Sequence, residues 1–248
     1  MSSSVYKKAL KLNSKATKSY YLKSQQKTEQ QKFLENILDE IIRKDDFNQN
    51  QLIADIACGG GTLSYHLSQK FPKANFTLVD YNDDGLEIAR SLNPGANFEF
   101  VNDNIFKLEK IPDSTYDFTF CWQTLSWIDE PHTVMDELLR ITKKGGRIFL
   151  SSLFNSDHDV DIYAKVYDYT LESGKNAIPF SYNTYSALSL EKWLNGKVES
   201  YKIRPFNTEI DFEYTGRGIG TFTVMGQDKR LQISAGMLLN WAIVDIIK

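Results

Sequence analysis

The segment LIADIACGGGTLS, residues 52–64, decides the fold of this chain. Its apolar first part, Leu52–Ala57, predicts a short buried strand, and apolar residues recur at helical spacing over Thr62–Phe71. Three glycines, Gly59–Gly61, stand at the turn between them. Glycine lets the backbone pass close beneath a ligand, and the first turn of the following helix adds unpaired N–H groups. The segment therefore predicts a βα unit with a ligand-binding turn.

The same alternation of strand and helix continues to about residue 155, which is typical of βαβ units on a parallel sheet. We predict an α/β, doubly wound (Rossmann-like), seven-stranded and mostly parallel sheet with helices on both faces. The first strands are expected at Leu52–Ala57, Asn75–Asp80, Phe98–Val101, Tyr116–Trp122 and Arg147–Leu153, and the intervening helices at Thr62–Phe71, Asp84–Leu92 and Thr133–Thr142.

The remaining segments are assigned around this core. No linker rich in Pro, Gly or Ser divides the chain, so residues 1–248 are expected to form one domain. Its parts are an N-terminal helical lid (1–45), a cofactor-binding core (50–155), a small substrate cap inserted in the C-terminal half (155–235) and a last strand (236–248). Within them we predict helices at Thr28–Ile42, Asp161–Ser173 and Ser189–Leu194, and strands at Lys197–Ile203, Glu209–Tyr214, Thr221–Met225, Leu231–Ser234 and Asn240–Ile247.

Composition narrows the class of protein. The net charge of −3 argues against a nucleic-acid-binding surface. The two cysteines, Cys58 and Cys121, lie in or beside predicted buried strands, so a reducing cytoplasm is expected. Neither a signal sequence nor a long apolar span is evident, and no metal site or membrane partner is expected. Oligomeric state cannot be inferred from these features.

The motif DIACGGGTLS, beginning at Asp55, resembles the first motif of class I S-adenosylmethionine (SAM)-dependent methyltransferases. The resemblance covers about residues 50–155 and implies SAM as cofactor, with S-adenosylhomocysteine as product. It implies that Asp55 orders the methionine amino group and that the backbone of Ala57, Cys58, Gly59 and Gly61 flanks the methionine portion. A dinucleotide fingerprint requires a third glycine where Ser64 stands.

Two further acids follow predicted strands. By the resemblance, Asp80 binds the ribose hydroxyls and Tyr81 packs beside adenine; the alternative for Asp80 is a helix N-cap. Asp103 receives the adenine amino group, Asn104 supplies backbone N–H, and Ile105 lines the ring. The alternative for this segment is an Asx-turn. The N-terminal lid places Tyr21 over the cofactor, in a segment with Tyr20, Lys23 and Ser24.

The end of the fourth strand is expected to face both cofactor and acceptor, because ligands of such sheets bind beyond the carboxyl ends of the strands. Cys121, Trp122 and Gln123 are placed at the cofactor, and Gln123 also orients the acceptor. Cys121 alternatively is a small buried hydrophobe. This segment lacks the Asn/Asp-Pro-Pro-Tyr/Phe motif of adenine methyltransferases.

Catalysis and acceptor binding are assigned less directly. His158, after the fifth strand, is a candidate general base for a hydroxyl acceptor, and its alternative is an exposed loop residue. Substrate contacts are predicted at Trp127, Phe154, Tyr163 and Tyr182, whose alternative is the ordinary core of the cap. The stripe Lys7, Lys11, Lys15 and Lys18 is a solvated helix face or a sign of an anionic acceptor.

The predicted function is methyl transfer to an O or N atom of a small molecule. The tail from Gly220 to Trp241 is similar to bacterial methyltransferases of sugar and surface-glycan modification, so a sugar, phosphorylated or nucleotide-linked acceptor is predicted. Two alternatives stay open: a non-catalytic SAM-binding partner subunit, and a Rossmann-like enzyme of other chemistry.

Overall fold

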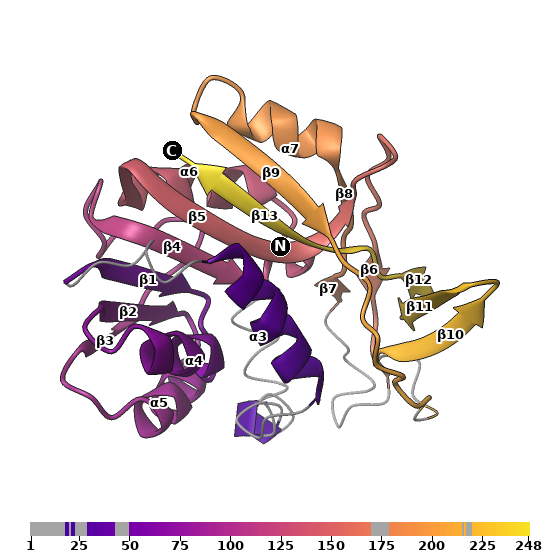
Figure 1. The fold of residues 1–248 in the computed structure, drawn as a ribbon, viewed down its shortest axis with the longest axis horizontal. Coiled ribbons are helices and arrows are strands. Elements are labelled where there is room, and N and C mark those ends of the chain that lie inside the picture. Colours follow the sequence, from indigo (N-terminus) through magenta and orange to yellow (C-terminus); the bar gives the residue numbers. More distant parts are fainter. Residues whose placement is uncertain are drawn as a thin grey trace.

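A twisted central sheet organises the molecule (Figure 1). The computed structural model describes residues 18–19, 21–22, 29–42, 50–169, 179–214, 216 and 220–248. The strands follow the order β3-β2-β1-β4-β5-β13-β9, and β8 pairs with β5 as an eighth strand. They are β1 (Leu52–Ile56), β2 (Asn75–Asp80), β3 (Phe98–Asn102), β4 (Tyr116–Trp122), β5 (Thr142–Asn155), β8 (Tyr185–Ser186), β9 (Ser200–Pro205) and β13 (Trp241–Ile247).

The sheet is mostly parallel, as predicted. β13 is the exception, because it runs antiparallel to both neighbours, β5 and β9. The strands of the first half lie where the sequence predicts them, with β5 longer at both ends. The fold class is therefore confirmed, with one short strand more than expected.

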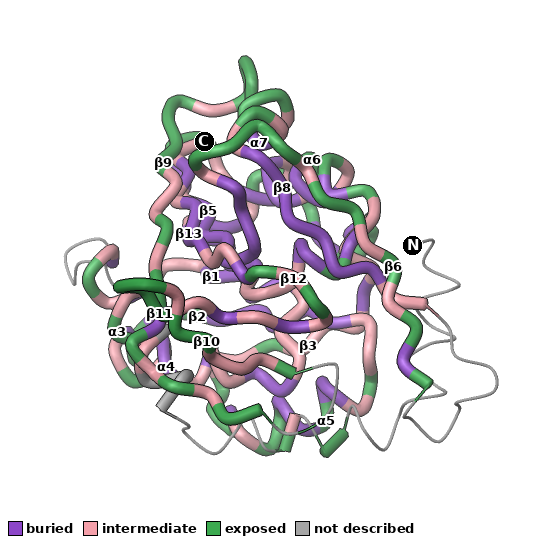
Figure 2. The backbone as a smooth tube through the Cα atoms, turned by 90° about the vertical axis from the view of Figure 1, so that its right-hand side faces the viewer, coloured by how far each residue is buried: buried purple, intermediate pink, exposed green. Residues whose placement is uncertain are grey.

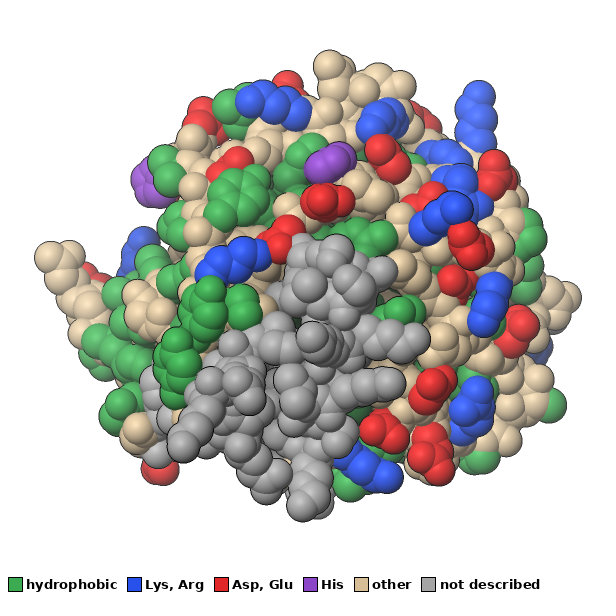
Figure 3. Space-filling model, turned by 180° about the vertical axis from the view of Figure 1, so that it is seen from behind, with side chains coloured by type: hydrophobic (Ala, Val, Ile, Leu, Met, Phe, Trp, Pro, Cys, Tyr) green, Lys and Arg blue, Asp and Glu red, His purple; other side chains and the backbone are tan. Residues whose placement is uncertain are grey.

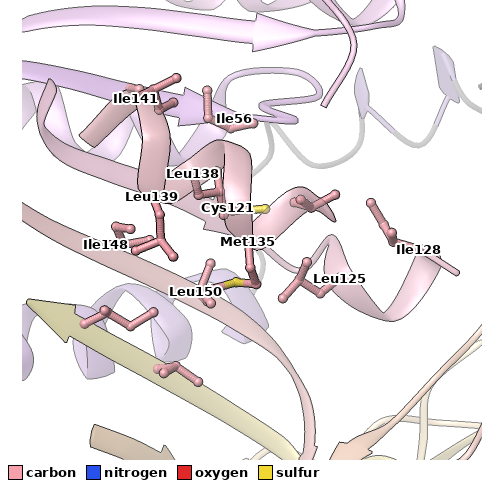
Figure 4. Close-up of a cluster of buried hydrophobic side chains, with 14 of the residues drawn as sticks. Ile56, Cys121, Leu125, Ile128, Met135, Leu138, Leu139, Ile141, Ile148 and Leu150 are labelled. Carbon is pink, nitrogen blue, oxygen red and sulfur yellow. The ribbon is translucent and has the colours of Figure 1, made fainter. Parts of the chain in front are cut away.

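Helices cover both faces of the sheet. α6 (Pro131–Ile141) and α7 (Ala187–Leu194) pack on one face, where the close-up of Figure 4 shows Met135, Leu138 and Leu139 of α6 meeting Ile148 and Leu150 of β5. α3 (Glu29–Ile41), α4 (Thr62–Lys70) and α5 (Asp83–Leu92) belong to the opposite face.

Two clusters of buried side chains form the core: the first lies under α6 and α7, and the second lies on the face of α3, α4 and α5. The second cluster is built around aromatic side chains of the sheet. Phe118, Phe120 and Phe149 pack there with Leu38 of α3 and Leu67 of α4. Full burial of each such side chain contributes roughly 1.5–3 kcal/mol, which is why strands with continuous apolar runs occupy the centre of the sheet.

The insertion, which is the predicted substrate cap of residues 155–235, departs from two predictions, one of a helix and one of a strand. Within the described residues 161–169 the expected helix Asp161–Ser173 is wrong: β6 (Lys165–Val166) pairs antiparallel with β7 (Phe180–Ser181). The β-branched and aromatic residues of this stretch fit a pleated arm better than a helix. Residues 170–173 lie outside the described part of the chain.

A second small sheet consists of β10 (Phe222–Gly226), β11 (Lys229–Ser234) and β12 (Met237–Leu238). The strand expected at Glu209–Tyr214 is wrong. Phe212 instead donates its N–H to the side chain of Thr223 (2.9 Å) and accepts from the N–H of Thr223 (2.9 Å), so a hydroxyl replaces one carbonyl of a regular ladder. Figure 2 shows β10, β11 and β12 mostly exposed or half-buried, whereas buried residues concentrate in β1, β5 and β13.

The surface carries charges of both signs. On the face in Figure 3, Lys and Arg side chains alternate with Asp and Glu. No helix in the described ranges has the length and apolar character to cross a membrane.

Candidate cofactor and acceptor site

A pocket lies at the carboxyl ends of the parallel strands, where the strand order reverses between β1 and β4. Such a reversal is where open α/β sheets bind their ligands. The pocket encloses about 600 Å³, open solvent at its mouth included. Its lining residues are Ile56, Ala57, Val79, Asp80, Tyr81, Asp103, Asn104, Ile105, Phe106, Thr124, Trp127 and Ile128. Six of the predicted cofactor residues and one predicted substrate residue therefore meet here.

The glycine turn between β1 and α4 uses left-handed backbone. Ala57 (φ 60°), Gly59 (φ 54°) and Gly61 (φ 73°) have positive φ angles. At Gly61 there is also no space for a side chain, since a Cβ would lie 2.7 Å from Asn93 Nδ2 and 2.9 Å from Ala89 Cβ. Glycine at this position thus serves both the turn and the close packing of α4 against α5.

Tyr21 lies against this turn, and its predicted position over the cofactor stays a prediction. A Cβ on Gly59 would lie 2.8 Å from Tyr21 Cε1, and one on Gly85 would lie 3.2 Å from Tyr21 Cε2. The ring therefore covers the glycine turn and the first residues of α5. Tyr20, Lys23 and Ser24, together with Lys7, Lys11 and Lys15, lie outside the described residues, and Lys18 is exposed.

Asp80 closes β2 and organises the backbone around it. Its Oδ2 accepts the N–H of Gly59 (2.8 Å) and its Oδ1 accepts the N–H of Asn82 (2.8 Å). Burial raises the pKa of Asp80, while these backbone donors oppose the rise. The predicted alternative, an N-cap, is wrong: the cap of α5 is Asn82, whose side chain accepts the N–H of Asp84.

Asp55 is buried at the end of β1. Its Oδ2 accepts the hydroxyl of Ser64 (2.7 Å), one turn into α4. Burial raises the pKa of Asp55 to about 6, the Ser64 hydrogen bond opposes this, and the nearby charge of Asp80 adds to it. A cation beside this carboxylate would reverse much of the cost of its burial.

Asp103 follows β3 and holds its own loop. Its Oδ1 accepts the N–H of Asn104 (2.8 Å) and its Oδ2 accepts the N–H of Lys110 (2.8 Å). Asn104 in turn accepts the N–H of Phe106 (3.1 Å) through its side chain, which is an Asx-turn. The turn alternative is thus present, and it coexists with a position in the pocket lining.

The end of β4 turns sharply. Gln123 has a φ of 52° and donates its N–H to the carbonyl of Ser151 (2.7 Å) on β5. Trp122 is half-buried against the second cluster of the core. Cys121 is fully buried in the first cluster, and burial raises the pKa of its thiol to about 12. The prediction that the Cys121 side chain contacts the cofactor is wrong, because it points into the core.

The residues predicted to contact the acceptor differ in their burial and in whether they line the pocket. Trp127 lines the pocket and packs on Tyr182, with ring centroids 4.9 Å apart. Phe154 is 1% exposed and packs against Tyr185, so the predicted acceptor contact there is wrong. Tyr163 is mostly exposed and meets the edge of Tyr185.

His158 lies in an exposed turn after β5 and is absent from the pocket lining. Its predicted proximity to the acceptor is not what the structure shows. β5 extends to Asn155, so the turn that carries His158 begins beyond the strand end. The position of the imidazole agrees with the alternative interpretation of His158, an exposed loop residue.

Sequence reasoning missed several residues. Phe106, Thr124 and Ile128 line the pocket without having been assigned, and Ser64 orients Asp55. The signal for Ser64 was its position three residues after Gly61, on the first turn of the helix that leaves the glycine turn. Phe106 had no comparable signal, because a loop decides its direction.

Comparison with known proteins identifies the domain to which the central part of the chain belongs. Residues 54–150 match the model of the methyltransferase domain. These residues form a class I SAM-dependent methyltransferase domain. The match spans β1 to β5, and so includes Asp55, Asp80, Asp103 and the glycine turn.

Relatives of the methyltransferase domain agree with this assignment. The chain is 27% identical to a malonyl-[acyl-carrier protein] O-methyltransferase 2 of Ilyobacter polytropus over 71% of this chain and 68% of the relative. It is 29% identical to a ubiquinone biosynthesis O-methyltransferase of Erwinia tasmaniensis, over 41% of this chain and 42% of the relative. The second match thus spans less than half of the relative's length.

The fold is shared more widely. A crystal structure of a putative methyltransferase from Bacillus halodurans superposes with a TM-score of 0.56 at 14% identity, covering 86% of this chain and 98% of that one. At this identity the likeness concerns the fold. The antiparallel β13 between β5 and β9 belongs to the region outside the matched domain.

Proposed function

We propose that this protein binds SAM in the pocket at the carboxyl ends of β1–β4 and transfers its methyl group to an oxygen or nitrogen of a small molecule. The observation that carries the proposal is the position of Asp80 and Asp103, at the carboxyl ends of β2 and β3, in the lining of one pocket beside the glycine turn, whose Gly59 N–H is held by Asp80. Asp55 lies buried at the end of β1, just before this turn.

The hydrogen-bond acceptors of the site fit the donor groups of SAM. A carboxylate has about four acceptor positions, and the backbone contacts of Asp80 leave capacity for two vicinal ribose hydroxyls. Asp103 likewise retains capacity for an adenine amino group, and Ile105 and Phe106 supply apolar walls. Asp55, with a raised pKa, suits the methionine ammonium, directly or through water.

When bound, SAM supplies a methyl group on a positively charged sulfur. The protein's own contribution is positioning and exclusion of water, which can provide much of the acceleration of an in-line displacement. Tyr21 covers the glycine turn, and Trp127 closes the pocket on the side of the insertion.

The names of the curated relatives favour an oxygen acceptor, since both are O-methyltransferases. They give no support to an acceptor from surface-glycan biosynthesis. An acceptor oxygen on a small molecule is therefore the form of the proposal that we carry forward.

The test is calorimetric titration of the full chain with S-adenosylhomocysteine, with NADH as the matched comparison. We expect saturable binding of S-adenosylhomocysteine and none of NADH. The reverse preference, or no binding of either, overturns the proposal. Transfer of a labelled methyl group from SAM to a panel of hydroxyl and amine acceptors then separates an enzyme from a non-catalytic SAM-binding subunit.

A further inference from the structure

Trp127 follows the end of β4 and is held in place by hydrogen bonds to the backbone on both of its sides. It ends the short 3-10 helix η2 (Leu125–Trp127), whose first residue is fully buried. Asn183 of the insertion binds this turn at two points. Its backbone N–H donates to the carbonyl of Ser126 (2.7 Å), and its side-chain amide donates to the carbonyl of Ile128 (2.9 Å). The backbone on both sides of Trp127 is thereby fixed.

The insertion also places two rings on Trp127. Phe180 and Tyr182 lie on the same face of the β6–β7 arm, and their centroids are 5.3 Å and 4.9 Å from that of Trp127. Trp127 is nevertheless 39% exposed, although it also lines the cofactor pocket. An indole that two rings support and that remains open is suited to stack on a third ring.

Lys165 and Asp129, which lie beside this aromatic group, neutralise each other. Lys165 Nζ donates to both carboxylate oxygens of Asp129 (2.6 Å each) and to Ser181 Oγ (2.8 Å). This lysine is thus not presented as a free cation toward a phosphate or carboxylate. Apolar side chains of Leu153, Val166 and Leu239 complete the surroundings of Tyr182.

We propose that Trp127, supported from behind by Phe180 and Tyr182, forms the acceptor wall, and that the acceptor is a flat, uncharged aromatic ring bearing the hydroxyl that is methylated. This inference rests on the proposed function and narrows it.

The chemistry balances without a further reactant. A lone pair of the phenol oxygen forms the new O–C bond while the S–C bond breaks and its electron pair stays on sulfur, which becomes neutral. The hydroxyl proton passes to water. Water suffices as the proton acceptor because the oxygen that gains the methyl group carries a positive charge until it loses this proton, and a protonated ether is a strong acid.

The experiment compares two probes of similar size, 2-naphthol and trans-2-decalol, titrated by calorimetry into the full chain saturated with S-adenosylhomocysteine. We expect 2-naphthol to bind at least tenfold more tightly. Trp127→Leu should weaken 2-naphthol at least tenfold and trans-2-decalol less than threefold. Phe180→Leu, which lies outside the cofactor pocket lining, should act in the same direction.

Tyr169→Leu is the matched control, because Tyr169 is an aromatic residue of the same insertion that stacks on Tyr167 and is 68% exposed. It should leave both probes unchanged. Equal affinity for the two probes, or 2-naphthol binding that neither Trp127→Leu nor Phe180→Leu weakens, overturns the aromatic wall.

Failure of the two proposals is distinguishable. Binding of S-adenosylhomocysteine without binding of 2-naphthol overturns the wall and leaves the cofactor proposal standing. If S-adenosylhomocysteine does not bind, the same titrations without it still test the preference for the flat ring.

Discussion

The cofactor half of the site and the acceptor half are built by different kinds of contact. Asp55, Asp80 and Asp103 lie at or just beside the carboxyl ends of their strands, and their polar partners lie in the turn or helix that follows or one strand away. Trp127 instead depends on Asn183, more than fifty residues further along the chain. The first half is therefore determined by the repeating βα pattern, whereas the second exists only once the insertion has folded over η2.

This difference predicts unequal tolerance to substitution. The cofactor half should be rigid and have no space for larger side chains. The insertion should tolerate substitutions outside the group around Trp127. Four variants test the contrast, in order of expected effect.

Gly61→Ala should have the largest effect, a loss of roughly 2–5 kcal/mol in the free energy of unfolding. The left-handed φ of 73° costs about 1–2 kcal/mol for alanine, and the clash with Asn93 and Ala89 adds about 1–3 kcal/mol. Gly196→Ala in the insertion is the control, since its φ is 71° but no heavy atom lies within 4 Å of a Cβ. Equal losses in urea unfolding would contradict the steric argument.

Asp55→Asn should stabilise the protein without cofactor and weaken SAM binding. The folded-state pKa of about 6 lies above the ordinary value of 3.8, so the folded protein binds this proton more tightly. Stability is therefore lost as pH rises from about 4 to about 6, by about 3 kcal/mol in full.

The asparagine variant avoids that cost and can still accept from Ser64. Its melting temperature should match that of the wild type near pH 4 and exceed it at pH 8, as differential scanning calorimetry would reveal. A constant difference across pH would show that Asp55 does not titrate in this way.

Asp80→Ala should weaken S-adenosylhomocysteine binding by about 1–3 kcal/mol, because hydrogen bonds to a charged acceptor are removed. It also removes the acceptor for the N–H groups of Gly59 and Asn82. Glu87→Ala, an exposed acid on α5, should leave affinity unchanged. Wild-type affinity in a folded Asp80→Ala protein would exclude the ribose role.

His158→Ala should have the smallest effect, with kcat within about twofold of wild type across pH 6–9, since surface positions rarely matter by more than about 0.5 kcal/mol. The imidazole is exposed and outside the pocket lining. A pH–rate profile with a methylated acceptor checks this. A strong fall in kcat with unchanged SAM affinity would restore His158 as the base and move the acceptor toward its loop.

The parallel core, the ends of its strands and the residues at those ends can all be predicted from the sequence. Apolar runs and period-3.6 patterns indicate which residues are buried, and the glycines between them indicate a turn, in which Gly59 and Gly61 have positive φ angles. Local pattern was therefore enough to place DIACGGGTLS, Asp80 and Asp103 at the carboxyl ends of their strands.

The tertiary structure alone decided the insertion and the acceptor side. Within residues 161–169, Lys165 and Val166 form a strand because Ser181 and Phe180 are available as partners, not because of a local pattern. In the same way, burial separates Phe154 from Trp127, two aromatic residues with equal sequence support. Which ring faces a pocket depends on long-range packing, and composition and periodicity do not encode that information.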